Sequence, residues 1–295
     1  MTAPAIEVFG LIKKYKRFTL GPLDLTVPSG AICGLIGTNG AGKTTTLDTI
    51  MGMVSLNHGY INVFGLDHIH HEVEIKREIG YVSPDIKFDA WGKVHRVLAL
   101  FKYYFPSWDD TYCADLLARF RINPEAKIQT LSFGDRVKLA LVTALAHRPK
   151  LLLLDEPLAG LDAVAKRQVF EELLHAVRNE ERTVVISSHN LSELERFVDH
   201  VALLDEGKLL VQGEISVLID RYKIVVCTLP VGLPRDRGGI YPQDREGDRY
   251  RLLVDTGDGA LQRLLDHNAR DIVESPITLE DLFIGLVKRG RRHDL

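Results

Sequence analysis

The sequence predicts an α/β fold with a mostly parallel central sheet, an inserted helical subdomain and a small C-terminal α+β extension. Strand-like apolar runs alternate with helix-like segments over most of the chain, which is typical of a parallel sheet. A composition shift near Glu214 then opens a tail rich in Gly, Arg and Asp. The length of 295 residues agrees with two domains at about 150 residues per domain.

Short strand-like runs open the chain. In the second run, Leu23, Leu25 and Val27 alternate with polar residues, as in a strand with one buried face. The third run is continuously small or apolar, as in a strand buried on both faces. The expected elements of this part are strands at 5–9, 18–27, 31–36 and 79–82 and a helix at 44–53.

The middle of the chain changes to helical spacing. Apolar residues recur at helical intervals from 91 to 148, between two predicted strands, so this block is expected to be inserted into the α/β core. Asp205-Glu206-Gly207 predicts a hairpin turn. Further elements are expected as strands at 151–154, 183–187, 201–204, 208–211, 224–228 and 250–254 and helices at 168–178 and 276–287. Thr278, with Asp281 three residues later, is a candidate cap of the last helix.

Composition excludes several classes of protein. The chain carries 37 basic and 40 acidic side chains, a net charge of −3, so nucleic acid is not an expected partner. Cys33, Cys113 and Cys227 lie far apart without a CxxC pair, which favours a reducing compartment over a disulfide framework or a zinc site. The N-terminus resembles no signal peptide, and no stretch approaches the roughly 18 apolar residues of a membrane helix.

A glycine-rich loop predicts a phosphate site. Gly37-Thr38-Asn39-Gly40-Ala41-Gly42-Lys43-Thr44 fits G-x-x-x-x-G-K-[ST] and lies between a predicted strand and a predicted helix. Glycines let backbone N–H groups turn toward one point, and a helix N-terminus favours an anion. We expect Lys43 to reach the β- and γ-phosphates and the Thr44 hydroxyl to bind Mg²⁺.

Two acids follow the apolar run 151–154. Asp155 and Glu156 would lie at the carboxyl edge of the sheet, where open α/β sheets bind ligands. Asp155 is expected to hold Mg²⁺ through water, and Glu156 to orient and polarise the attacking water. The pattern on its own also fits a strand end followed by a solvated turn.

The motif order resembles that of the nucleotide-binding subunit of an ATP-binding cassette (ABC) transporter. The likeness runs from about 5 to 215. Its motifs are Walker A at 37–45, ending in Thr45, Walker B at 151–156, the signature Leu131-Ser132-Phe133-Gly134-Asp135, the D-loop Ala159-Gly160-Leu161-Asp162 and the switch histidine of Ser187-Ser188-His189. This resemblance implies a P-loop NTPase core with an antiparallel β subdomain: a nucleotide-binding domain at 1–215, with its helical subdomain at about 86–148, and an accessory domain at 216–295.

The resemblance also implies roles for single residues, with ATP and Mg²⁺ as cofactors. His189 would contact the γ-phosphate and position water with Glu156, which makes these two the catalytic pair. Tyr15 stands where the family places an aromatic ring that stacks on adenine. Lys13-Lys14-Tyr15-Lys16-Arg17 also fits a solvated turn.

A head-to-tail pair of cassettes is implied as well, either identical or different. Ser132 and Gly134 of one subunit would meet the γ-phosphate held by the other, and Asp162 would act across the dimer. A separate transmembrane permease would be the second partner. The resemblance therefore implies a cytoplasmic protein, peripheral on the inner face of the plasma membrane.

The sequence departs from the family pattern at two places. Asp135 stands where the signature usually has glutamine, and its charge would either cap a helix or weaken ATP-driven closure. The usual Q-loop glutamine is absent from Ser83-Pro84-Asp85. Asp85 fits a metal or water ligand as well as it fits a turn residue beside proline.

Three functions fit these motifs to different degrees. The first is an ATP-hydrolysing transporter subunit, for which the single cassette and the exporter-like tail favour export over import. The second is a non-transport cassette ATPase acting on ribosomes or DNA, but no second cassette or long coiled coil is visible. The third, another P-loop enzyme such as a small-molecule kinase, leaves the signature, the D-loop and His189 unexplained.

Overall fold

The computed structural model describes residues 3–84, 86–180, 182–234 and 236–291. It contains two compact units. The first runs to Asn190 and includes Leu204–Leu209, and the second takes Leu191–Leu203 and the chain from Leu210 onward. The expected boundary at 215/216 falls at the start of helix α8 (Ile215–Arg221), a few residues beyond the point where the second unit resumes.

A six-stranded sheet in the order β10-β9-β3-β8-β7-β6 carries the functional motifs. Strands β3, β8, β7 and β6 pair in parallel. Every residue of β3, β7 and β8 is buried, because their apolar runs are covered on both faces. The predicted parallel core is therefore confirmed. The strands are β3 (Ile32–Gly37), β6 (Ile79–Val82), β7 (Leu151–Leu154), β8 (Thr183–Ser188), β9 (His200–Asp205) and β10 (Lys208–Glu214).

The predicted hairpin turn between β9 and β10 is present. Glu206 and Gly207 both have positive φ, 45° and 79°, as the two central residues of a type I′ turn require. A side chain at Gly207 would collide with the backbone, since a Cβ there would lie 2.1 Å from the Thr19 carbonyl oxygen.

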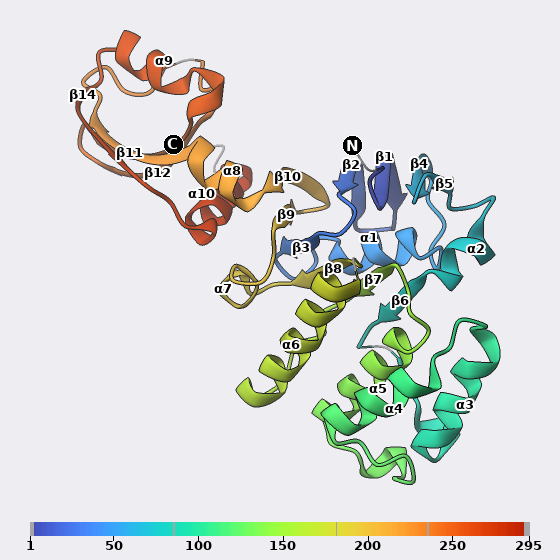
Figure 1. Cartoon of the computed structure of the whole chain (residues 1–295). Coiled ribbons are helices and arrows are strands. Elements are labelled where there is room, and N and C mark those ends of the chain that lie inside the picture. Colours follow the sequence, from blue (N-terminus) through green and yellow to red (C-terminus); the bar gives the residue numbers. More distant parts are fainter. Residues whose placement is uncertain (1–2, 85, 181, 235, 292–295) are drawn as a thin grey trace. The chain divides into compact units, whose positions relative to one another are not determined.

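Helices cover both faces of this sheet. Helix α1 packs against β3 and α6 against β8, on opposite sides (Figure 1). Helix α6 begins earlier than expected, directly after Asp162, whose carboxylate accepts a hydrogen bond from the Ala165 N–H (2.8 Å). The two helices are α1 (Lys43–Ile50) and α6 (Ala163–Glu180).

An antiparallel sheet in the order β2-β1-β4-β5 completes the core of the first unit. Leu23, Leu25 and Val27 are all buried, which confirms the predicted alternation. The strands are β1 (Ile6–Lys14), β2 (Thr19–Val27), β4 (His58–Val63) and β5 (Leu66–Asp67), followed by the short helix α2 (Glu72–Arg77).

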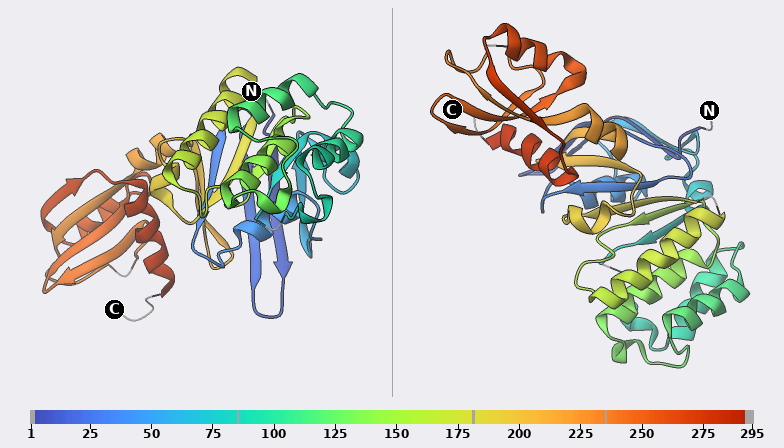
Figure 2. Two further views of the ribbon diagram at one scale, coloured as in Figure 1. Left: turned by 90° about the horizontal axis from the view of Figure 1, so that it is seen from below. Right: turned by 60° about the vertical axis from the view of Figure 1, so that its left-hand side comes forward.

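The expected helical block is present between β6 and β7 (Figure 2). Helix α5 packs against α4 and β6. Gly80 of β6 permits this approach, because a Cβ there would lie 2.3 Å from the Ala144 carbonyl oxygen. The elements are η1 (Asp89–Trp91), α3 (Val94–Tyr104), α4 (Asp110–Phe120), η2 (Ile128–Thr130) and α5 (Phe133–Leu145).

The second unit has a core of its own. A four-stranded antiparallel sheet, in the order β12-β13-β11-β14, buries Val225, Leu252 and Val254 against Leu264 of α9. Helix α10 packs against β12, α7 and α8. The elements are α7 (Leu191–Leu194), α8, β11 (Tyr222–Thr228), β12 (Ile240–Glu246), β13 (Arg249–Asp255), η3 (Thr256–Asp258), α9 (Ala260–Asp266), β14 (Arg270–Ser275) and α10 (Leu279–Arg291).

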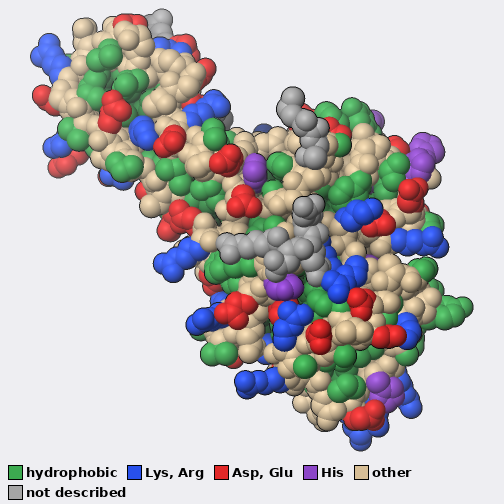
Figure 3. Space-filling view, viewed as in Figure 1, with side chains coloured by type: hydrophobic (Ala, Val, Ile, Leu, Met, Phe, Trp, Pro, Cys, Tyr) green, Lys and Arg blue, Asp and Glu red, His purple; other side chains and the backbone are tan. Residues whose placement is uncertain are grey.

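Helix α10 has the predicted cap. The Asp281 N–H donates to Thr278 Oγ1 (3.1 Å), and the Thr278 N–H donates to the Asp281 carboxylate (3.0 Å). No helix of the described chain is both long and apolar enough to span a bilayer. Basic and acidic side chains are interspersed over the face shown in Figure 3.

Candidate functional site

The glycine-rich loop connects β3 to α1, as the sequence predicts. Gly37 ends β3, and a Cβ there would lie 2.4 Å from the Leu204 carbonyl oxygen, so only glycine fits. Gly42 precedes α1 with φ +105°, a conformation that glycine adopts without strain. The loop therefore aims the N-terminus of α1 at the open space above the strand ends.

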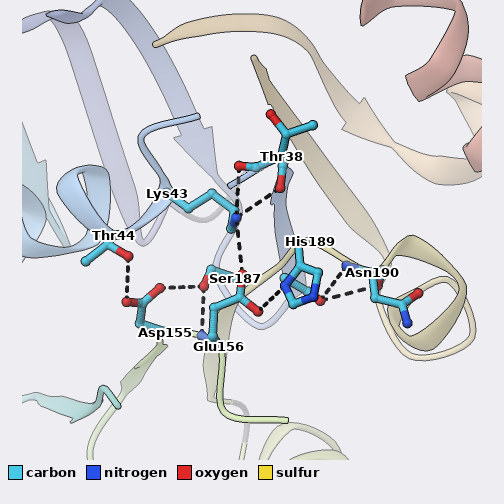
Figure 4. A network of polar contacts seen from close by, with 10 residues as sticks. Thr38, Lys43, Thr44, Asp155, Glu156, Ser187, His189 and Asn190 are labelled. Carbon is cyan, nitrogen blue, oxygen red and sulfur yellow. Dashed lines mark hydrogen bonds and ion pairs between the residues drawn. The ribbon is translucent and has the colours of Figure 1, made fainter. Parts of the chain in front are cut away.

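Lys43 is buried although it is charged, with 6% of its surface exposed. Its ammonium donates to the carbonyl oxygens of Gly37 (2.9 Å) and Thr38 (3.3 Å). It also pairs with Glu156, with 3.1 Å between Nζ and Oε1 (Figure 4). These three contacts hold the ammonium at the mouth of the loop. A phosphate oxygen of a bound nucleotide would accept the hydrogen bonds that the ammonium donates to them.

The two acids after β7 face the loop from the other side. The Thr44 hydroxyl contacts Asp155, with 2.8 Å between Oγ1 and Oδ2. Glu156 has a left-handed backbone, with φ +45°, and its carboxylate divides its contacts between Lys43 and His189. The distance from Glu156 Oε2 to His189 Nδ1 is 2.9 Å. Residues that follow β3, β7 and β8 thus meet at the carboxyl edge of the parallel sheet.

A cavity of about 370 Å³ lies over the loop. It is lined by Phe18, Asn39, Gly40, Gly42, Lys43, Thr44, Thr45 and Glu156. Thr38 and Ala41 do not line it: the Thr38 hydroxyl lies 3.3 Å from the Asp205 carboxylate, and Ala41 is buried. The cavity collects most of the phosphate-loop residues named from the sequence.

Phe18 is a cavity residue that the sequence analysis missed. Its ring lies against Gly42, since a Cβ on Gly42 would be 3.1 Å from Phe18 Cζ. Tyr15 is half exposed and does not line the cavity itself, but its ring stands 6.5 Å from that of Phe18 at an interplanar angle of 30°. The sequence feature that could have identified Phe18 is its position, three residues after the aromatic Tyr15.

Ser187 is the second missed residue. It lies near the end of β8, and its hydroxyl is 2.6 Å from Asp155 Oδ1 and 2.9 Å from the Glu156 backbone nitrogen. The sequence feature that could have identified Ser187 is its place at the end of a run of buried apolar residues.

The signature residues lie at the start of α5 and do not line the cavity over Lys43. Ser132 caps α5: the Asp135 N–H donates to Ser132 Oγ (3.1 Å), and the Ser132 hydroxyl lies 2.7 Å from the Asp135 carboxylate. Gly134 lies beside Leu161, and the Phe133 ring packs on Gly160. The signature thus packs on the D-loop that ends in Asp162, and Ser132 and Gly134 do not line the cavity over Lys43.

The altered Q-loop borders a second cavity, of about 200 Å³, which extends to Asp155 and Glu156. Ser83 and Pro84 contribute to its lining, whereas Asp85 lies outside the described residues. Just before them, burial raises the pKa of Tyr81, whose hydroxyl donates to the Asp48 carboxylate (2.8 Å). That bond ties β6 to α1.

No group of three or more His, Cys, Asp or Glu in the described chain is arranged to hold a metal by itself. The expected metal ligands Thr44 and Asp155 are adjacent, but they supply only two oxygen donors. A metal bound there needs further ligands from phosphate and water, as Mg²⁺ sites in nucleotide-binding proteins do.

The profile of the ABC transporter family matches residues 20–159. The ABC transporter ATP-binding protein YtrB of Bacillus subtilis is 30% identical over 276 residues, 92% of this chain and 94% of YtrB. The bacitracin transport ATP-binding protein BcrA of Bacillus licheniformis is 30% identical over 300 residues, 97% and 98% of the two chains. The Nod factor export ATP-binding protein I of Rhizobium johnstonii is 29% identical over 297 residues, 97% and 95%.

Solved structures give the same fold. An ATP-binding subunit of an ABC transporter superposes with a TM-score of 0.67 at 24% identity, covering 73% of this chain and 92% of that one. The dimeric cassette MJ0796, bound to ADP and phosphate, superposes with a TM-score of 0.64 at 19% identity, covering 71% and 98%.

Proposed function

The chain belongs to the ABC transporter family, and from this premise we propose how its residues bind and hydrolyse ATP. It is an ATP-binding, ATP-hydrolysing subunit of a transporter. Cassettes of this family dimerise and work with membrane permease subunits.

The observation that carries the proposal is the meeting of Lys43, Glu156 and His189 at one sheet edge. Lys43 and the loop 37–45, including Thr45, bind the phosphates of ATP, which replace the ammonium's contacts to the loop carbonyls. Glu156 then polarises the attacking water, and His189 holds that water and the γ-phosphate in place. Phosphoryl transfer needs mainly such positioning and charge neutralisation.

Magnesium fits the oxygen donors beside the loop. The Thr44 hydroxyl and Asp155 Oδ2 are hard oxygen ligands 2.8 Å apart, next to the place where phosphate oxygens enter. In the proposed complex, Mg²⁺ neutralises phosphate charge, and Asp155 holds it directly or through water. The metal role of Asp85 remains a proposal from the sequence.

The nucleobase is proposed to rest on two aromatic rings. The rings of Tyr15 and Phe18 lie 6.5 Å apart, and Phe18 lines the cavity over the loop. Stacking on aromatic faces is available to any purine. Phe18 therefore joins Tyr15 in the proposed adenine site.

The signature surface is proposed to serve a second cassette. Ser132, Gly134 and Asp162 stand away from the cavity of their own chain, which supports a role at the ATP held by a partner subunit. Each ATP would then lie between the loop of one chain and the α5 N-terminus of the other. Both identical and different partner cassettes satisfy this arrangement.

Transport is proposed to run outward, with the chain peripheral on the inner face of the plasma membrane. Several similar proteins carry export in their names, which supports export over import. Trp91 and Tyr104 of the helical block are 41% and 66% exposed and are candidate contacts for the permease. Nucleic acid is not a proposed partner, because a net charge of −3 provides no basic excess to bind it.

The proposal is tested by measuring Mg-ATP hydrolysis per chain as protein concentration rises, with Glu156→Gln in parallel. We expect the wild-type rate to climb with concentration, because each site needs two chains. The variant should keep ATP binding, lose nearly all hydrolysis and accumulate as an ATP-bound dimer.

Glu72→Gln is the matched control, since Glu72 is an exposed glutamate paired with Lys76. It should hydrolyse ATP as the wild type does. Turnover of Glu156→Gln at the wild-type rate would remove Glu156 from the chemistry and overturn the proposed mechanism.

A further inference from the structure

The hydroxyl of Ser187 bridges the two acids of the site. Ser187 is 1% exposed, and its Oγ lies 2.6 Å from Asp155 Oδ1 and 2.9 Å from the Glu156 backbone nitrogen (Figure 4). Neither contact depends on a ligand. We infer that Ser187 is a positioning residue that orients Asp155 and Glu156 for metal-dependent ATP hydrolysis, an inference that rests on the function proposed above.

The direction of each hydrogen bond follows from the groups involved. The Glu156 N–H can only donate, so Ser187 Oγ accepts from it. The single hydroxyl proton of Ser187 is then free for the Asp155 carboxylate, which can only accept when ionised. Oδ1 of Asp155 is thereby occupied by Ser187, and Oδ2 is the oxygen that faces Thr44.

The separate contacts of the two Asp155 oxygens matter for the proposed metal site. A carboxylate with both oxygens free could rotate about its last bond, whereas the bond from Ser187 fixes the plane of Asp155. Oδ2 is held toward the Thr44 hydroxyl, the second oxygen of the proposed magnesium site. Ser187 thus acts on the proposed metal site through Asp155 and is not itself a metal ligand.

Ser187 also restrains the peptide that leads into Glu156. Glu156 has φ +45°, a left-handed conformation that is strained for a residue with a side chain. The hydrogen bond from its N–H to Ser187 holds the peptide group in that orientation. The carboxylate of Glu156 consequently leaves the backbone toward Lys43 and His189.

The register of the parallel sheet brings the three residues together. Leu154 of β7 pairs with Ile186 of β8, so Asp155 and Ser187 are the next residues along neighbouring strands. The preceding residues of β8, Val184, Val185 and Ile186, are buried and apolar. A serine at the end of this run is a costly choice for packing alone, because a buried hydroxyl must be hydrogen-bonded.

The chain offers a matched control in the adjacent serine. Ser188 is 5% exposed and ends the same strand, but its hydroxyl accepts from the Asn190 N–H (3.0 Å) and contacts neither acid. Ser187→Ala and Ser188→Ala each remove one buried hydroxyl. Only the first removes a bridge between Asp155 and Glu156.

The experiment measures binding of a fluorescent ATP analogue with EDTA and with Mg²⁺, followed by ATP hydrolysis over a range of Mg²⁺ concentrations. For Ser187→Ala we expect the affinity in EDTA to stay at the wild-type value, because the phosphate loop is intact. The gain in affinity on adding Mg²⁺ should be mostly lost. The half-maximal Mg²⁺ concentration should rise or kcat should fall by about 10- to 100-fold, as for other residues that support metal ligands.

Two further variants separate positioning from folding. Ser187→Thr keeps the hydroxyl and should regain most of the magnesium response. Should the added methyl group unfold the chain, as judged by its thermal transition, Ser187→Cys replaces it; a thiol is a weak hydrogen-bond donor, so this variant should behave like Ser187→Ala. Ser188→Ala should respond to Mg²⁺ as the wild type does.

The inference is overturned if Ser187→Ala keeps the wild-type magnesium response and kcat while the wild type binds and hydrolyses Mg-ATP. It is also overturned if Ser188→Ala loses as much as Ser187→Ala, since the effect would then come from the strand. A wild-type chain that neither hydrolyses ATP nor binds the analogue more tightly with Mg²⁺ would instead reject the proposed function.

Discussion

Lys43 is almost fully buried, so little solvent competes with a ligand for its ammonium. Its ammonium is satisfied by two loop carbonyl oxygens and by Glu156. An incoming phosphate offers the same number of oxygen acceptors with more negative charge. Phosphate binding therefore replaces the contacts of the Lys43 ammonium with new ones and never leaves the ammonium without a partner. The cost of an unpaired buried charge is thus avoided.

Asp135 competes for the hydroxyl that the signature would offer to ATP. Its carboxylate lies 2.7 Å from Ser132 Oγ and adds negative charge at the α5 N-terminus. The charge stabilises the free helix but repels a phosphate that approaches the same N–H groups. We therefore expect Asp135 to stabilise the free chain and to oppose closure on ATP.

Asp135→Gln should therefore hydrolyse ATP at an equal or higher rate. The gain is expected to be about two- to fivefold, the factor that corresponds to 0.3–1 kcal/mol of charge interaction at a helix end. The measurement is ATP hydrolysis at saturating Mg-ATP, together with the ATP concentration that gives half the maximal rate.

Asp89→Asn controls for a general change in surface charge, since Asp89 is similarly exposed and pairs with Arg136 without touching Ser132. A large loss of rate in Asp135→Gln alone would contradict the expectation and give the aspartate a positive role.

Among the elements, the ends of β7 and β8 organise the site. Asp155 and Glu156 leave β7, and Ser187 and His189 lie at the end of β8. Because the two strands are parallel neighbours, consecutive residues on each come side by side. The site needs no long loop to assemble it.

In the second unit, α8 is joined to β13 by a two-pronged ion pair. Arg221 Nε and Nη2 each lie 2.7 Å from one oxygen of Asp255. Burial raises the pKa of Asp255, but the hydrogen bonds from Arg221 outweigh it, and the net pKa lies below its ordinary value. The ionised pair thus stabilises the folded unit above the ordinary aspartate pKa of about 3.9, and this contribution is lost as pH falls through the lowered value.

Asp255→Asn should lower the free energy of unfolding by about 2 kcal/mol at pH 7, because the charged hydrogen bonds between Arg221 and Asp255 are lost. Arg221 is half exposed, so water can still solvate its charge in the variant. The difference from the wild type should shrink as pH falls below about 4. Denaturant unfolding of the full chain at several pH values measures both effects.

Asp258→Asn provides the comparison, since Asp258 is exposed and pairs with Arg263 at 3.3 Å; its change should be small. A difference between Asp255→Asn and wild type that does not vary with pH would show that ionisation of Asp255 is not the source of stability.

For the whole molecule, the two units have separate cores. The residues proposed to touch ATP all lie in the first unit, and the second unit has its own buried cluster. A ligand stabilises the part of the protein that its binding site requires to be folded. The nucleotide effect should therefore be confined to one unit.

Hydrogen exchange read by mass spectrometry should show this difference. With Glu156→Gln and Mg-ATP at about 100 times its Kd, amides in 37–50 and 151–160 should exchange up to roughly 100-fold more slowly, since binding then contributes about 2.7 kcal/mol. Peptides within 240–275 should change little.

Mg²⁺ without nucleotide is the control and should protect neither set. Equal protection of both sets by Mg-ATP would mean that the two units open together and would contradict the separation.

The sequence was informative where local patterns are strong. Buried apolar runs predicted β3, β7 and β8, and the loop, the α10 cap and the hairpin turn each follow from a few neighbouring residues. Strands β4, β5, β12 and β14 were missed. β12 contains Pro242 and several charged residues, and β14 is exposed on both faces, so neither shows the alternation of a half-buried strand.

The sequence by itself determined the α/β class, the phosphate loop and the two acids after the apolar run, because those depend on residues adjacent in the chain. His189 was named only through the family resemblance. Only the tertiary structure decided that Ser187 bridges Asp155 and Glu156 and that Phe18 lies over Gly42. These contacts join segments more than 20 residues apart. They follow from the register of neighbouring strands and the packing of a side chain on a bare backbone, neither of which leaves a repeating pattern in the sequence.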